Sequence, residues 1–335
     1  MPHPHGYELV RRALNFDASA ALPYTLPIDA PVIERLNAHY GGTEWQARVH
    51  NAIAWVSVPN LRMQPAGHLQ NRDIFGAAWR TDQRPFHLEK PALDGPDLSG
   101  YRWPAIDEIW DEAAVKAQVE RGRELGQFVV GSTGMGLFER SWTFRGFENA
   151  MTDMLLNPGF YNALLDGILA IHLQVVERLA ALGVDGILLS DDWGDQRGVI
   201  MGPRLWRKFI QPRAAAYFAA VHAAGKWTFQ HCCGNVTAII PEMIASGLDV
   251  LESLQPEAMD VYAIKRRFGR ELRLWGGLGT QQMIPFGTPQ AIRAEVQRLR
   301  DELGAGGGYI LAPAKPLLPE VPTENAAAVV EAFTG

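Results

Sequence analysis

The sequence predicts a soluble α/β protein of the (β/α)8 TIM-barrel class, with its active site at the carboxyl ends of the barrel strands. From about residue 125 onward, short apolar runs alternate with helical stretches, and this alternation implies a parallel sheet. Two further apolar runs upstream bring the count to eight strands, the number that closes such a barrel. We therefore expect residues 1–335 to form a single barrel domain.

The expected strands are short and apolar, and most end in polar or glycine residues, as buried parallel strands do. In chain order they are Leu22–Ile28, Ile53–Pro59, Gln127–Ser132, Gly186–Asp192, Trp227–Cys233, Asp249–Leu254, Leu272–Gly277 and Tyr309–Ala314. Helical segments are expected between and after them, at Phe160–Leu182, Pro203–Ala224, Thr288–Leu303 and Thr323–Phe333. The alternative fold, a doubly wound open sheet, is disfavoured because no GxGxxG follows the first strand.

Residues 61–104 interrupt the alternation of strands and helices. Within them, Asp73–Arg80 is predicted to form a small hairpin, and a proline-rich connection follows it. We expect this insertion to be an N-terminal elaboration that lies over the mouth of the barrel.

Composition excludes several classes of function. The formal net charge of −6 argues against a nucleic-acid partner, which requires a basic face. No apolar run reaches the roughly 18 residues of a membrane span, and the first residues have no apolar signal-peptide core. We expect a cytoplasmic protein that acts on small molecules.

Polar residues at the strand ends are the candidates for chemistry, because barrel enzymes place their reactive groups there. Asp191, Asp192 and Glu257 are the candidate catalytic carboxylates. The candidate substrate contacts are Asn60, Gln255, Gln281 and Lys315.

The most specific element is His231-Cys232-Cys233, which contains the only two cysteines of the chain. Side chains alternate along a strand, so His231 and Cys233 should point to the barrel mouth about 7 Å apart, and Cys232 toward the helices. An imidazole and a thiolate with this spacing can bind one Zn2+. The alternative is a buried cysteine pair beside a hydrogen-bonded histidine.

The adjacent carboxylates Asp191 and Asp192 form the second element. They could bind a metal, act as an acid or base, or cap a helix. Because Trp193 and Gly194 follow, and the next helix is expected only near Pro203, simple capping is not favoured.

These elements in this order resemble the uroporphyrinogen decarboxylase superfamily. The resemblance is closest to its branch of methylcobamide:coenzyme M methyltransferases and related corrinoid-dependent demethylation enzymes. It covers residues from about 125 to the end, and the first 120 residues only loosely. The matching stretches are Leu137–Glu148, Leu189–Gln196, His231–Asn235, Trp275–Phe286 and Gly306–Asn325.

The resemblance implies a TIM barrel in which zinc, held by a His-x-Cys pair and a later cysteine, activates a thiol that accepts a methyl group from methylcobalamin. His231 and Cys233 match the pair, but the later cysteine should fall near Ala314–Lys315, where this chain has none. Glu257 or Asp191 could supply the missing ligand. Decarboxylases of the family carry an arginine-rich segment at the end of the first strand, where this chain has Leu26–Asp29. Porphyrinogen decarboxylation is therefore disfavoured.

Three functions remain open. The first is a zinc-assisted methyltransferase with a corrinoid protein or free methylcobalamin as methyl carrier, docked at the barrel mouth. The second is a cofactor-free decarboxylase or lyase, with Asp191 or Asp192 as acid/base and Lys315 or Arg140 holding a substrate carboxylate. The third is a non-catalytic barrel homologue. By analogy alone, the chain could be a homodimer.

Overall fold

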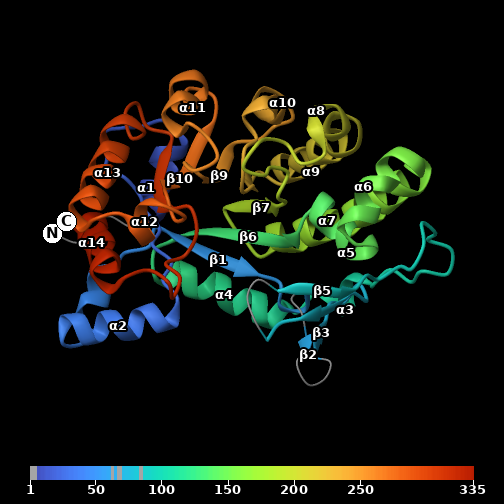
Figure 1. Cartoon of the computed structure of the whole chain (residues 1–335), viewed down its shortest axis with the longest axis horizontal. Helices are drawn as coiled ribbons and strands as arrows, with labels where there is room; N and C mark the ends of the chain where they lie inside the picture. The colour runs from blue at the N-terminus through green and yellow to red at the C-terminus, as the bar shows by residue number, and fades with distance from the viewer. Residues whose placement is uncertain (1–5, 62–63, 66–69, 83–85) are drawn as a thin grey trace.

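A computed structural model describes residues 6–61, 64–65, 70–82 and 86–335 of the chain. Seven parallel strands form one curled sheet in the order β1-β6-β7-β8-β9-β10-β11 (Figure 1). Their bounds are β1 Ile53–Ser57, β6 Phe128–Met135, β7 Gly186–Ser190, β8 Trp227–His231, β9 Val250–Leu254, β10 Arg273–Leu278 and β11 Tyr309–Pro313. The parallel sheet and seven of its expected strands are confirmed.

The remaining expected strand, Leu22–Ile28, is extended backbone with isolated bridges instead of a regular strand. Its Thr25 amide donates to the Leu311 carbonyl at 2.9 Å, and its Tyr24 carbonyl accepts from the Ala52 amide at 2.9 Å. The segment thus joins β11 to the residues just before β1. The prediction of a regular strand was wrong here because Pro23 and Pro27 have no N–H to donate to a ladder.

Helices follow the strands as the alternating pattern predicts (Figure 1). The expected helix at Pro203–Ala224 is divided into α8 and α9 by a π-helical turn at Trp206–Ile210. The helices are α1 Gly6–Leu14, α2 Ala30–Tyr40, α3 Ile106–Ile109, α4 Glu112–Glu124, α5 Leu137–Arg145, α6 Phe147–Leu156, α7 Pro158–Ala181, α8 Gly202–Leu205, α9 Gln211–Ala223, α10 Ile240–Ala245, α11 Val261–Phe268, α12 Met283–Phe286, α13 Pro289–Glu302 and α14 Thr323–Thr334.

Helix α7 is long and apolar enough to cross a membrane, by length and composition alone. Leu164, Leu165 and Ile168 on this helix are buried in the main hydrophobic core. Helix α7 therefore supplies side chains to the packed interior of the protein.

Side-chain alternation along the strands divides the core into two layers. Val129 of β6 faces the helices and belongs to the larger cluster, whereas Phe128 and Val130 face the inside of the curled sheet. Val10 and Leu14 of α1 close this inner cluster at the amino ends of the strands. The next inward positions, toward the carboxyl ends, carry polar side chains: Ser132, Ser190, His231 and Glu252.

The insertion contains a four-stranded antiparallel sheet, β2 Gln64–Pro65, β3 Gln70–Arg72, β4 Ala78–Arg80 and β5 His87–Lys90, beyond the carboxyl end of β1 (Figure 1). Strands β3 and β4 form a hairpin with Asp73–Ala77 as its turn, so its first strand precedes the range Asp73–Arg80 expected from the sequence. A buried ion pair of 2.7 Å joins Asp73 to Arg140 of α5. The insertion is thereby fixed against the helix that follows β6.

Candidate metal centre

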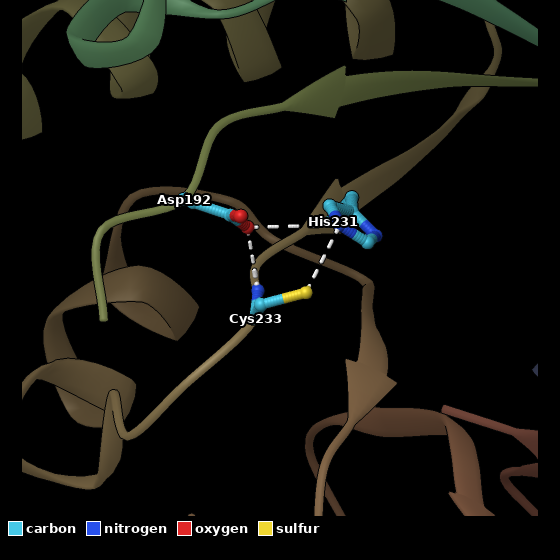
Figure 2. A group of neighbouring side chains, drawn as sticks. All are labelled: Asp192, His231 and Cys233. Atoms are coloured by element: carbon cyan, nitrogen blue, oxygen red, sulfur yellow. Dashed lines mark hydrogen bonds and ion pairs between the residues drawn. The ribbon is translucent and has the colours of Figure 1, made fainter. Parts of the chain in front are cut away.

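Asp192, His231 and Cys233 converge at the carboxyl ends of β7 and β8 (Figure 2). The Nε2 atom of His231 lies 3.5 Å from Sγ of Cys233 and 3.6 Å from Oδ1 of Asp192. One ligand atom from each residue lies within 4.8 Å of the other two. All three side chains are half-buried, so a small molecule can reach them.

The other ring nitrogen of His231, Nδ1, contacts the carboxylate of Glu252 on β9. The two residues are register partners on neighbouring strands, so the backbone holds the contact in place. Metal-binding histidines commonly donate their second N–H to a carboxylate, which fixes the ring and its tautomer. Glu252 therefore directs Nε2 toward Cys233 and Asp192.

Competing effects act on the pKa of His231. Burial alone would lower this pKa, but the charge of Glu252 and hydrogen bonds to Cys233 and Glu252 outweigh it and raise the pKa well above its ordinary value. Without a metal, these contacts favour the imidazolium form, which carries two ring protons. Binding of a cation at Nε2 must displace one of them.

Two glycines allow the loops after β7 and β8 to touch. A Cβ atom on Gly234 would lie 2.4 Å from the carbonyl carbon of Gly194, and Gly234 has a φ of 78° that side chains disfavour. This close approach lets the Cys233 amide donate to Oδ1 of Asp192 at 2.7 Å. The glycines after the Asp-Asp and Cys-Cys pairs therefore bring Asp192 beside the His-x-Cys pair.

Asp191 has a different environment from Asp192. Its buried carboxylate accepts from the amides of Phe138 and Glu139 at 2.9 and 2.8 Å, and from the Trp193 indole N–H at 2.6 Å. Burial raises its pKa to about 6, against the effect of these bonds. Asp191 thus caps the amino end of α5. The argument against capping was wrong, because it considered only the helix that follows in sequence.

Two carboxylates at this site were not singled out from the sequence. Glu252 lies in the middle of an expected strand, and a carboxylate among mostly apolar strand residues was the available signal. Glu139 lies in the first turn of α5, beyond the expected end of β6. Burial, followed by the charges of Asp192 and Asp191, raises the pKa of Glu139 to about 8. Glu139 therefore holds a proton at neutral pH.

Two other candidates organise the surrounding loops. Gln255 accepts from the Gly234 amide at 3.0 Å. Oε1 of Glu257 accepts from the amides of Gln281 and Gln282 at 2.8 and 3.1 Å. Across the described ranges, the third metal-capable group beside the His-x-Cys pair comes from Asp192, not from Glu257 or Asp191 as the sequence suggested.

The remaining candidates lie at more exposed positions. The Gln281 side chain accepts from Gln196 at 3.0 Å, and Asn60 donates to the Glu108 carbonyl at 3.1 Å. Lys315 is exposed just beyond β11.

The two cysteines differ as strand alternation predicts. Cys232 is fully buried in the layer between sheet and helices, and its Sγ accepts from the Trp193 amide at 3.1 Å. Burial raises the pKa of its thiol well above the ordinary value. Cys233 lies on the side of His231.

Residues 141–335, more than half of the chain, match the model of the uroporphyrinogen decarboxylase (URO-D) family. The chain belongs to the URO-D family. The methylcobamide:CoM methyltransferase MtaA of Methanosarcina barkeri is 30% identical over 150 residues, which are 45% of this chain and 41% of the relative. The uroporphyrinogen decarboxylase of Geobacter sulfurreducens is 24% identical over 196 residues, which are 56% of this chain and 52% of the relative.

These matches span only about half, or less, of each curated relative. A methyltransferase structure from Methanosarcina mazei covers 98% of both chains with a TM-score of 0.73 and 19% identity. At this identity, the likeness shows a shared fold. These relatives are enzymes of two kinds, methyltransferases and decarboxylases. The Methanosarcina barkeri relative supports the methyltransferase-like branch of the family.

Proposed function

We propose that this URO-D family member is the methyltransferase of a corrinoid-dependent methyl-transfer or demethylation system, and that zinc assists it. The convergence of Asp192, His231 and Cys233 carries the proposal, because it joins a nucleophilic sulfur to a directed imidazole at the carboxyl ends of the strands. The name of the Methanosarcina barkeri relative, a methylcobamide:CoM methyltransferase, supports the same chemistry.

The spacing of the donor atoms fits zinc. Zn–S bonds of about 2.3 Å and Zn–N bonds of about 2.0–2.1 Å at a tetrahedral angle separate the two ligand atoms by about 3.6 Å. The His231–Cys233 separation is 3.5 Å. A nitrogen and a carboxylate oxygen around zinc should be about 3.4 Å apart. The His231–Asp192 separation is 3.6 Å. Three protein ligands leave the fourth position for a substrate, as in catalytic zinc sites.

Zinc held there would act as a Lewis acid and favour the deprotonated form of a bound thiol or oxygen nucleophile. The residues around it have distinct tasks. Glu252 keeps the proton of His231 at Nδ1, so that Nε2 stays available. Asp192 replaces the later cysteine of the family pattern. Glu139 holds a proton beside Asp192 and can deliver it to a departing anionic group.

The proposal extends to the surroundings of the site. We place the insertion over the mouth of one closed barrel domain, where a corrinoid protein or free methylcobalamin would dock. Asn60, Gln255, Gln281 and Lys315 would then border the bound small molecule, and Asp191 and Glu257 would fix the loops that carry the site. A cytoplasmic homodimer is part of the same proposal.

The decarboxylase relatives favour a second candidate, a cofactor-free carboxy-lyase. Protonated Glu139 could supply the proton that replaces the carboxyl group. Against it, Arg140, one of the cations considered for a substrate carboxylate, is buried and already paired with Asp73. The acidic side chains around His231 would also repel a carboxylate substrate.

The test is demethylation of methylcobalamin by zinc-loaded protein in the presence of a panel of small thiols. The absorbance change of methylcobalamin reports the reaction. We expect activity that is lost in Cys233→Ala and retained in Cys232→Ala. Release of CO2 from a carboxylic acid by metal-free protein, without demethylation of methylcobalamin, would instead establish the lyase.

A further inference from the structure

A column of aromatic rings runs through the inside of the curled sheet, with stacked pairs at its two ends and tilted or edge-on contacts between them. Tyr7 and Phe128 lie 6.0 Å apart between ring centroids, Phe128 and Phe229 6.2 Å, Phe229 and Trp275 5.8 Å, and Trp275 and Trp55 5.0 Å. The three middle rings are buried, but the end members are exposed, Tyr7 by 38% and Trp55 by 44%. The column therefore presents one accessible ring at each end.

The exposed fraction of the Trp55 side chain is unusual for a residue in the middle of a strand. Trp55 lies in the middle of β1, between buried Ile53 and Val56. Alternation points its side chain inward with Ile53, and its indole stacks on Trp275 at an interplanar angle of 18°. Because Trp275 covers one face of the indole, the area that stays exposed lies on its other face and its edges. An inward residue can be this exposed only where the interior is open above it.

The exposed indole lies on the same inner surface as the metal centre. Trp275 is the register partner of Glu252, and Glu252 is the register partner of His231. Neighbouring strands are about 4.8 Å apart, so Trp275 is two strand spacings, roughly 10 Å, from His231 along one row. The Trp55 ring stacks on Trp275, at the end of this row away from His231.

We propose that Trp55 is a binding platform for the small-molecule substrate, and that this substrate carries a neutral planar aromatic ring. The assignment rests on the proposed methyl transfer, in which the reacting group must approach Cys233. A flat ring on the exposed indole gains both buried apolar area and stacking.

The charges around the platform select the class of ring. Asp192 and Glu252 border the row, one on each side of the His231 ring. Carboxylates repel an anionic ligand but attract the positive edge of an uncharged aromatic ring. This favours a phenyl ether or a related neutral aromatic compound over a carboxylic acid.

Binding can be measured by 19F NMR on zinc-loaded protein that contains 5-fluorotryptophan. Trp55→Phe assigns the Trp55 resonance by its absence, and 4-methoxyphenol serves as the aromatic probe. We expect a saturable shift of the Trp55 resonance. In a ligand-observed titration, Trp55→Leu should weaken binding roughly five- to tenfold, and Trp55→Phe should largely restore it.

Tyr7→Leu is the matched control, because Tyr7 is the similarly exposed ring at the opposite end of the same column. It should leave binding of 4-methoxyphenol unchanged. If cyclohexyl methyl ether shifts the Trp55 resonance as much as 4-methoxyphenol or more, the assignment of an aromatic ligand is overturned. If choline binds more tightly than 4-methoxyphenol, the platform is a cation site instead. An unmoved Trp55 resonance would reject the platform. Zinc content measured on the same samples reports separately on the metal centre, so failure of one proposal is not mistaken for failure of the other.

Discussion

Replacing Glu252 by Gln tests whether the second carboxylate controls the metal centre. The substitution keeps the length of the side chain but removes the charge that faces Nδ1 of His231. A charge-assisted hydrogen bond is about twice as strong as a neutral one, and loss of such a partner typically weakens metal binding about 10- to 100-fold. This corresponds to about 1.4–2.7 kcal/mol. We expect zinc affinity at pH 8 to fall by this amount.

The effect should depend on pH in a defined direction. The Glu252 charge also raises the pKa of His231, so protons compete with zinc more strongly in the wild type as the pH falls. The difference in zinc affinity between wild type and Glu252→Gln should therefore shrink from pH 8 to pH 6. Competition with a chromogenic chelator such as pyridylazoresorcinol measures both affinities.

The chain offers a matched control for this experiment. His222 and Asp249 form a second histidine–carboxylate pair, 2.8 Å apart, and Asp249 immediately precedes β9 at the amino ends of the strands. Asp249→Asn should leave zinc affinity unchanged even if it lowers stability. An unaltered affinity in Glu252→Gln, or an equal loss in Asp249→Asn, would refute the reasoning.

Three further predictions concern the cysteines, a buried histidine and a buried arginine. Cys233→Ser should lose most of the zinc by elemental analysis, whereas Cys232→Ser should keep it and lower the free energy of unfolding by about 1–3 kcal/mol, because a hydroxyl replaces a thiol in the core. Buried His172 has a pKa lowered to about 3, mainly by burial, so the unfolded chain binds the extra proton as the pH falls below about 6.5. Urea unfolding should therefore show that the wild type loses about 3 kcal/mol more than His172→Phe between pH 7 and pH 4; parallel pH profiles would contradict this. Arg140→Met should lower the unfolding free energy by about 3–5 kcal/mol by leaving Asp73 buried without its cation, and a loss below 1 kcal/mol would show that the pair is dispensable.

Features with local periodicity could be predicted from the sequence. The apolar runs identified seven strands of the sheet, and alternation placed Cys233 with His231 and Cys232 in the core. The segment Leu22–Ile28 was also located, but not its irregular form, since its prolines limit hydrogen bonding to isolated bridges.

Features that depend on distant parts of the chain could not be predicted in the same way. Asp191 caps a helix about 50 residues earlier in the sequence, and no local pattern links the two. Glu252 meets His231 only because β8 and β9 pair in one register. Asp192 joins the cysteine because two glycines let their loops touch. Each of these contacts is created by tertiary packing.

Zinc-edge anomalous diffraction from crystals of the zinc-loaded protein tests the central claim most directly. We predict a peak within bonding distance, about 2.0–2.3 Å, of Nε2 of His231, Sγ of Cys233 and a carboxylate oxygen of Asp192. A peak bound instead through Nδ1 of His231, a peak only at another site, or no peak after zinc loading would contradict the account.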